Sequence, residues 1–171
     1  MKSPFFALLA AVLCLCTGCA GYHLGATVPK RMEGIKTIAV PTFHNDTLVP
    51  RLEVLAASTV VQQFQEDGTL AVRSSSDADA ILEGTITKIV RHGARSVRSD
   101  IVQQQEYNLT LTMHYTVTRR TTGEQIDEAN VIGQTSFFVS GNDVNQDERQ
   151  AVPLAIEQAS ARIVSKVTTG W

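Results

Sequence analysis

Apolar and polar side chains alternate most regularly between residues 107 and 118. Every second residue in this stretch is apolar, and the residues between them are Asn, Thr and His. A period of two residues is typical of an antiparallel strand that buries one face in a core. The pattern therefore predicts a half-buried strand over 107–118, whose inward face consists of Tyr107, Leu109, Leu111, Met113, Tyr115 and Val117.

Shorter apolar stretches predict the other strands of a sheet. They are rich in β-branched residues and end at turn-forming or helix-breaking residues, as strands do. The predicted strands span 35–40, 70–73, 80–90 and 126–139. The stretch 91–105 is basic and then polar, and we expect it to form a long hairpin connection. Gly133 interrupts the last strand and is expected to mark a β-bulge.

Helical spacing of apolar residues predicts two helices. The first is expected to open at Pro50, a favoured first helical position, and to stop at Gly68. The second is expected over about 146–167, where Pro153 either lies in the first turn of a late-starting helix or kinks the helix. The order of elements indicates an α+β fold, with two helices packed on one face of a small mixed four-stranded sheet.

The first 18 residues have a different pattern from the rest of the chain. Lys2 precedes an uncharged, mostly apolar run over 5–16, which is shorter than the ~20 residues of a membrane-spanning helix. A basic start, an apolar run and small residues are typical of a secretory signal peptide. We therefore expect a signal peptide over 1–18, a lead segment over 19–34 and a single domain over 35–171.

Cys19 follows Thr17 and Gly18 and resembles the acceptor cysteine of bacterial lipoproteins. In that motif the cysteine receives diacylglyceryl and a further fatty acid such as palmitate, and becomes the first residue of the mature chain. Three lipid chains anchor a protein firmly to a bilayer without spanning it. Ala20 at the next position resembles lipoproteins that are sorted to the cell outer membrane. The alternative is an ordinary signal peptide that leaves a free thiol at Cys19.

Composition and charge exclude further classes of function. The chain has 171 residues, of which 43% are hydrophobic, with 15 Lys and Arg against 17 Asp and Glu. This length suits one globular domain with a packed core. The formal net charge of −2 argues against a protein that binds nucleic acid through bulk charge.

No residue pattern indicates a catalytic, metal or cofactor site. Histidines at metal-ligand spacing, a Gly-rich phosphate loop and a nucleophile elbow are all missing from the sequence. Asp77 and Asp79 are close together, but they fall in a predicted turn, where Asp commonly bonds to the local backbone. A lipid-anchored enzyme is therefore the least favoured class, and we expect no cofactor.

Two features suggest interactions. A basic cluster near the end of strand 80–90 is suited to anionic lipid or phosphate groups, or is a solvated hairpin. It consists of Lys88, Arg91, His92, Arg95 and Arg98. The polar face of strand 107–118 either contacts water or is buried inside a larger polar cavity, such as a porin-like lumen. The residues of that face are Asn108, Thr110, Thr112, His114, Thr116 and Thr118.

Several segments in order resemble the LptE family of lipopolysaccharide-assembly lipoproteins. They are Cys19-Ala20-Gly21-Tyr22-His23-Leu24, 35–40, 41–47, 50–53, 78–84, the strand 107–117 and the final helix ending in Trp171. The resemblance implies a non-enzymatic plug inside an LptD-like outer-membrane β-barrel, on the periplasmic side, which assists lipopolysaccharide insertion into the outer leaflet. It also implies that basic residues bind lipopolysaccharide, and by position these are Arg91, Arg95 and Arg98.

A second group of lipoproteins shares part of this pattern. The residues of 40–47 and 78–84 also resemble activators of peptidoglycan synthases and curli-secretion lipoproteins. Such activators usually have a long flexible tether. Only 16 residue steps separate Cys19 from residue 35, which reach at most about 53–58 Å. This short reach favours a domain held close to the membrane, and hence the first family.

Overall fold

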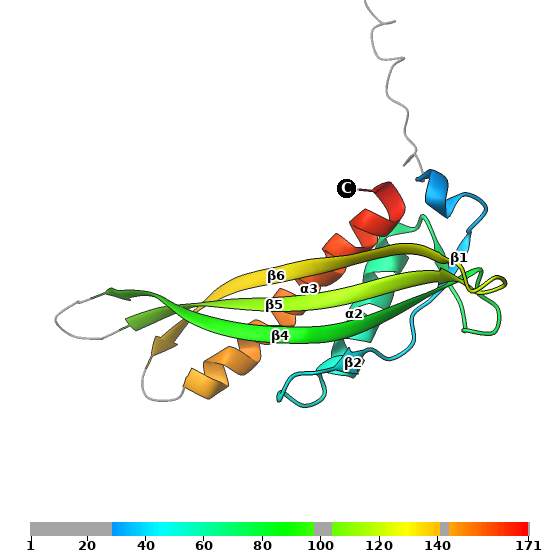
Figure 1. The fold of residues 1–171 in the computed structure, drawn as a ribbon. Helices are drawn as coiled ribbons and strands as arrows, with labels where there is room; N and C mark the ends of the chain where they lie inside the picture. Colours follow the sequence, from blue (N-terminus) through cyan, green and yellow to red (C-terminus); the bar gives the residue numbers. More distant parts are fainter. Residues whose placement is uncertain (1–28, 98–103, 141–143, 171) are drawn as a thin grey trace, which may run out of the picture.

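The computed structural model describes residues 29–97, 104–140 and 144–170. The expected signal peptide, Cys19, Arg98 and Trp171 lie outside the described residues. The elements, in chain order, are η1 (Lys30–Met32), β1 (Thr37–Ala39), β2 (His44–Asn45), α2 (Leu52–Asp67), β3 (Ala71–Val72), β4 (Ala80–Val97), β5 (Gln104–Arg119), β6 (Gln125–Ser140) and α3 (Val144–Thr169) (Figure 1).

The described strands form one mixed sheet. Its order is β3-β1-β4-β5-β6, with β2 paired to β4 beside this path. The pairs β1–β3, β1–β4 and β2–β4 are parallel, whereas β4–β5 and β5–β6 are antiparallel. The α+β prediction is confirmed, but the sheet has six strands and not four, because all five predicted strands and the short β2 join it. β2 was missed because a two-residue strand is too short to show a period, and only its pairing with β4 makes it extended.

β4 and β5 extend much further than their apolar patterns predict. Their antiparallel register continues to the pair Val97–Gln104, so the prediction of a hairpin connection over 91–105 was wrong. Backbone pairing continues through polar residues because each added pair gains ladder hydrogen bonds, whatever the side chains are. Register shifts between Ile86 and Lys88 and between Gly93 and Arg95 interrupt this long pairing.

The core lies between the sheet and the two helices. The alternating apolar residues of β5 from Leu109 to Val117 are fully buried, as their period of two predicts. α3 covers β5 and β6, and its apolar stripe packs on them. Val60 and Phe64 of α2 join the same cluster. Each fully buried apolar side chain contributes about 1.5–3 kcal/mol, so this layer of contacts is the main source of stability.

The helix boundaries differ from the predictions at two prolines. α2 begins at Leu52, after the N-cap residue Arg51, so Pro50 lies outside the helix. Gly68 ends α2 as predicted, at a φ of 72°, and its N–H donates to the Phe64 carbonyl. α3 begins at Val144, so Pro153 lies inside the helix, and of the two alternatives for this proline the late start is wrong.

Gly133 does not form the predicted bulge. It pairs with Leu111 in continuous register, and the one register shift between β5 and β6 is at Val117 and Thr118. A Cβ at residue 133 would overlap the Ala155 carbonyl oxygen of α3. Glycine is therefore required because the backbone of α3 approaches the sheet closely at this point.

Candidate functional site

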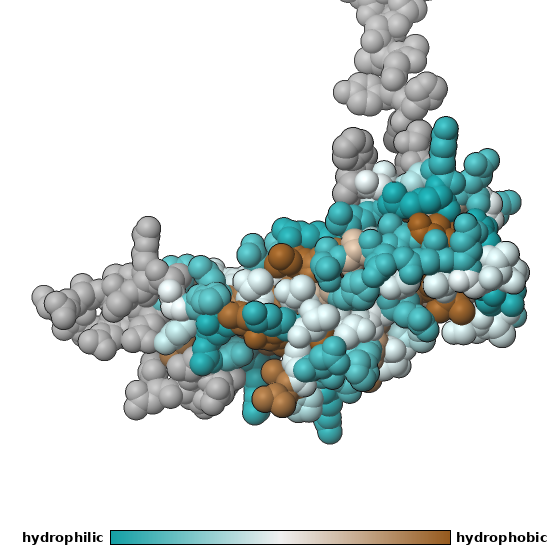
Figure 2. All heavy atoms as spheres, in the orientation of Figure 1, coloured by the Kyte–Doolittle hydropathy of each residue, from teal (hydrophilic) through white to brown (hydrophobic). Residues whose placement is uncertain are grey.

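The sheet face opposite the helices carries the Thr-rich row of β5. We call this surface the open sheet face, and it is turned to the viewer in Figures 1 and 2. Figure 2 shows it largely hydrophilic, with a few separate apolar spots. The cross-strand registers place polar neighbours on both sides of the β5 row. The face comprises Glu83, Thr85, Lys88, Val90 and His92 of β4, Asn108, Thr110, Thr112, His114, Thr116 and Thr118 of β5, and Glu128, Asn130, Ile132, Gln134 and Ser136 of β6.

His114 lies at the centre of a polar group on this face. Its Nε2 is 3.2 Å from Oε1 of Glu128, and its Nδ1 is 3.3 Å from Oδ1 of Asn130. Which ring nitrogen donates depends on the tautomer, and an imidazole with one N–H can donate to one of these two oxygens at a time. The open sheet face thus presents hydroxyl, amide and carboxylate groups that can exchange hydrogen bonds with a polar surface.

The alternation of β4 divides the predicted basic cluster between two surfaces. Lys88 and His92 lie on the open sheet face and are exposed. Arg91 pairs with buried Leu109 and therefore lies on the helix side, where its guanidinium contacts Glu148 of α3. The same guanidinium lies 5.6 Å from the centre of the Tyr107 ring, a cation–π contact.

The other two predicted lipopolysaccharide ligands are less fully described. The backbone of Arg95 pairs with that of Glu106, and Arg98 lies outside the described residues. The sequence pattern found the basic cluster, but it could not show that a strand would direct successive side chains to opposite faces.

Asp77 bonds within its own turn, as predicted, but the prediction of local bonding was wrong for Asp79, whose partners lie 42 and 43 residues away in the chain. Oδ2 of Asp79 accepts hydrogen bonds from the backbone N–H groups of Lys36 and Thr37 and from the Thr37 hydroxyl. These bonds, first of all the one from Lys36, lower the pKa of Asp79 below 3.8. Hydroxyl donors Ser74 and Ser76 likewise lower the pKa of Asp77. Asp79 thus connects β1 to the start of β4.

Replacing Asp79 with asparagine is expected to lower the thermal unfolding midpoint by several degrees at pH 7. Oδ2 of Asp79 accepts three hydrogen bonds, and the uncharged amide of asparagine would accept them more weakly than the carboxylate does. Because the pKa of Asp79 is depressed in the folded state, its stabilisation is present above the unfolded value of 3.8. It is lost as the pH falls through the lower folded value.

Thermal unfolding between pH 7 and pH 2 measures this difference. The gap between wild type and Asp79→Asn should close at the acid end of the range. Asp77→Asn is the matched control, because the side-chain hydrogen bonds of Asp77 stay within its own turn and their loss should matter less. A difference in unfolding midpoint that stays constant down to pH 2 would contradict a stabilising role for the ionised Asp79 carboxylate.

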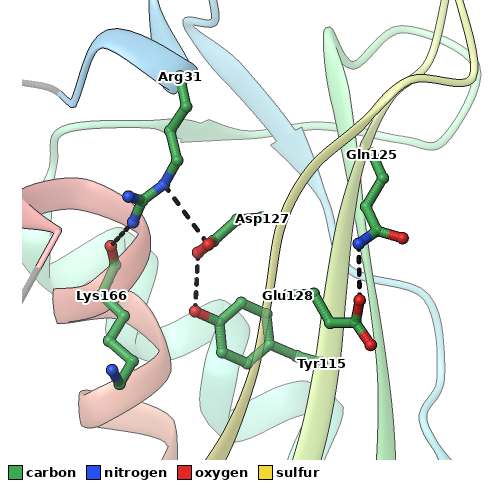
Figure 3. A network of polar contacts seen from close by, with 6 residues as sticks. All are labelled: Arg31, Tyr115, Gln125, Asp127, Glu128 and Lys166. Carbon is green, nitrogen blue, oxygen red and sulfur yellow. Dashed lines mark hydrogen bonds and ion pairs between the residues drawn. The ribbon is translucent and has the colours of Figure 1, made fainter.

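A polar network, which the sequence pattern did not predict, connects η1, β5, β6 and α3 (Figure 3). The buried Tyr115 hydroxyl donates to Oδ2 of Asp127 at 2.8 Å, and Nε of Arg31 lies 3.5 Å from Oδ1 of the same carboxylate. Nη2 of Arg31 donates to the Lys166 carbonyl near the end of α3 at 2.9 Å. Burial, and next the bond to Asp127, raise the pKa of Tyr115. The network attaches the first described segment to the end of α3.

The described residues contain no group of three or more His, Cys, Asp and Glu side chains that could hold a metal ion. Within the same residues, no helix is long and apolar enough to cross a membrane.

The family model for lipopolysaccharide assembly, LptE, matches residues 35–167. No curated protein matches the sequence. A hemagglutinin homolog from Helicobacter pylori has a similar structure, with a TM-score of 0.50 and 9% identity over 78% of this chain and 85% of that one. A minor lipoprotein from Acinetobacter baumannii is similar at a TM-score of 0.49 and 13% identity, over 78% of this chain and 90% of that one. At these identities the likeness concerns the fold alone.

Proposed function

The chain belongs to the LptE family of lipopolysaccharide-assembly proteins, and on this premise we propose that it plugs the lumen of an LptD-like outer-membrane barrel. In this proposal it is anchored through Cys19 to the periplasmic side of the outer membrane. It assists the barrel in inserting lipopolysaccharide into the outer leaflet. It acts by binding and positioning, without chemistry of its own.

The observation that carries the proposal is the open sheet face. A lumen of an outer-membrane barrel is polar, with hydrogen-bonding side chains along its wall. The open sheet face offers the matching chemistry over three long strands, and its hydroxyl groups carry no charge that would need a counter-ion. We assign Asn108, Thr110, Thr112, His114 and Thr116 as the centre of the contact with the barrel wall.

We further propose that the end of the β4–β5 hairpin meets lipopolysaccharide. Arg91, Arg95 and Arg98 are the assigned contacts, since Arg matches the geometry of phosphate groups. Arg91 already contacts Glu148, so it can bind a phosphate only by sharing or leaving this carboxylate. Arg95 and Arg98 therefore carry more of this proposal than Arg91 does.

Affinity purification of the tagged full-length protein from detergent-solubilised outer membranes tests the proposed function. A large barrel that co-purifies in about equal amount supports the plug. A penicillin-binding protein in the eluate, without a barrel, would overturn the plug and support activation of peptidoglycan synthases as the function instead.

Replacing Cys19 with serine is expected to move nearly all of the protein from the membrane fraction to the soluble fraction. Each buried methylene of a lipid chain contributes about 0.8 kcal/mol, so loss of the chains removes the anchor. Fractionation and labelling with radioactive palmitate measure the change. Cys16→Ser is the matched control and should keep both label and anchor. Loss of label in the control instead would assign the lipid to Cys16.

A further inference from the structure

A groove lies between the start of α2 and the first half of α3, on the helix side of the sheet. Its volume is about 810 Å³. Its lining is mostly apolar and consists of Leu48, Val49, Pro50, Leu52, Leu55, Val152 and Pro153, with Arg51, Glu148 and Arg149 among them. Leu48 is 102% exposed, the most exposed large apolar side chain among the described residues. A leucine so fully exposed gains free energy when a partner covers it.

Backbone strain occurs at the same groove. Arg51 has a φ of 67°, and it is the one non-glycine residue with positive φ in the described part of the chain. This left-handed conformation is unfavourable for a side chain with a Cβ, and a glycine would adopt it freely. No side chain caps α2 at this point. Residues with strained backbone are concentrated at sites that bind a ligand. The strained residue here is Arg51, and its side chain lines the groove.

The groove runs beside an unpaired strand edge. The Asp46 N–H donates to the Ile86 carbonyl, so the loop that carries Leu48 leaves β4 at Ile86. Glu148 lines the groove and contacts Arg91 of β4. This contact shows that the groove lies close to β4 near residue 91. Beyond Ile86, the described part of β4 pairs only with β5. Its outer edge over 88–91 therefore has backbone groups free to pair with another extended chain.

The charges around the groove select the kind of chain that fits. Arg51 and Arg149 are exposed and have no ion pair among the described side chains. Glu148 is the one acidic residue of the lining, and it is already paired with Arg91. The charges of the groove lining that are left without an ion pair are therefore cationic, and an occupant with carboxylates beside an apolar side chain is complementary to them.

We infer that an extended segment of a partner protein, acidic and with an apolar anchor, binds in this groove. It adds as a strand to β4 over 88–91, places an apolar side chain against Leu48 and Leu55, and directs carboxylates to Arg51 and Arg149. An acyl chain would fill the apolar part but could not use the unpaired backbone of β4. This inference rests on the proposed function, because the partner is the barrel that the plug enters.

Photocrosslinking in cells tests the inference on the full-length lipoprotein. p-Benzoylphenylalanine is placed at Leu48, and in a matched control at Val54, which is 59% exposed but does not line the groove. We expect Leu48 to crosslink to the barrel polypeptide, and Val54 to give far less product. Mass spectrometry should place the crosslink in a segment that has Asp or Glu close to an apolar residue.

A second variant separates binding from folding. Arg51→Gly removes the guanidinium and also relieves the positive φ, so the fold should become more stable. The Leu48 crosslink should nevertheless fall about tenfold, the size expected for loss of a charge-assisted contact. A yield that does not fall, or a mapped segment without acidic residues, would overturn the charge complementarity on which the inference stands.

The remaining outcomes are also decisive. A Leu48 crosslink only to lipopolysaccharide or to a second copy of this chain overturns the inference, as do equal yields from Leu48 and Val54. A barrel that co-purifies without any Leu48 crosslink overturns the inference alone and leaves the proposed function in place. A purification without any barrel overturns both.

Discussion

Replacing Gly133 with alanine is expected to lower the free energy of unfolding by about 3 kcal/mol or more. A Cβ at this position overlaps the Ala155 carbonyl oxygen and crowds the Ala159 side chain. Relief requires movement of a whole helix, because the overlapping atom belongs to the backbone. Such movement would also break two hydrogen bonds to the edge of β6. These are the bond from the Gln134 N–H to Gln158 and the bond from Arg162 to the Ile132 carbonyl.

Urea unfolding of the purified mature protein measures this effect. Gly93→Ala is the matched control, because Gly93 is also a strand glycine, but a Cβ there meets only the Tyr107 ring at 3.9 Å. We expect the control to change stability by less than about 1 kcal/mol, with the loss of chain entropy in the unfolded state favouring alanine. Similar stability of the two variants would mean that α3 does not approach β6 so closely.

Replacing Thr110 with arginine is expected to reduce co-purification of the barrel at least about tenfold without loss of folding. Thr110 lies on the open sheet face between Val90 and Gln134, so the new side chain has no like charge directly opposite. In the free protein the guanidinium remains hydrated. Against a barrel wall it would be desolvated without a partner, and an unpaired buried charge is strongly unfavourable.

Affinity purification and a thermal melt of each variant, taken together, measure this effect. Ala161→Arg is the matched control, because Ala161 is exposed on α3, outside the sheet. We expect Thr110→Arg to lose the barrel and Ala161→Arg to keep more of it, with both unfolding near the wild-type temperature. Equal retention of the barrel by both variants would mean that the open sheet face is not the contact surface.

The strongest sequence patterns predicted the core correctly. The period of two in β5 correctly predicted the buried side chains from Leu109 to Val117, whereas Tyr107 at the start of the pattern is only partly buried. The apolar stripe of α3 and the stop of α2 at Gly68 were also read correctly. These features depend on repeated local signals, because burial on one face of a regular element leaves a periodic trace in the residues themselves.

Features that depend on contacts between distant residues left no such trace. β2 is extended because it pairs with β4, and Gly133 is required because α3 passes over it. Arg31 and Asp127 are distant in sequence, and nothing in their neighbourhoods marks them as partners. The groove at Leu48 likewise combines residues from two helices and a loop.

The candidate site divides in the same way. The sequence by itself determined that one face of β5 is polar and rich in Thr, and that positive charge gathers near residues 88–98. Only the tertiary structure decided that three strands combine their polar faces into one surface, and that Arg91 is turned to the helices and contacts Glu148. The physical reason is that a strand pattern specifies which side chains share a face. Which neighbours cover that face, or leave it open, depends on how the whole chain packs.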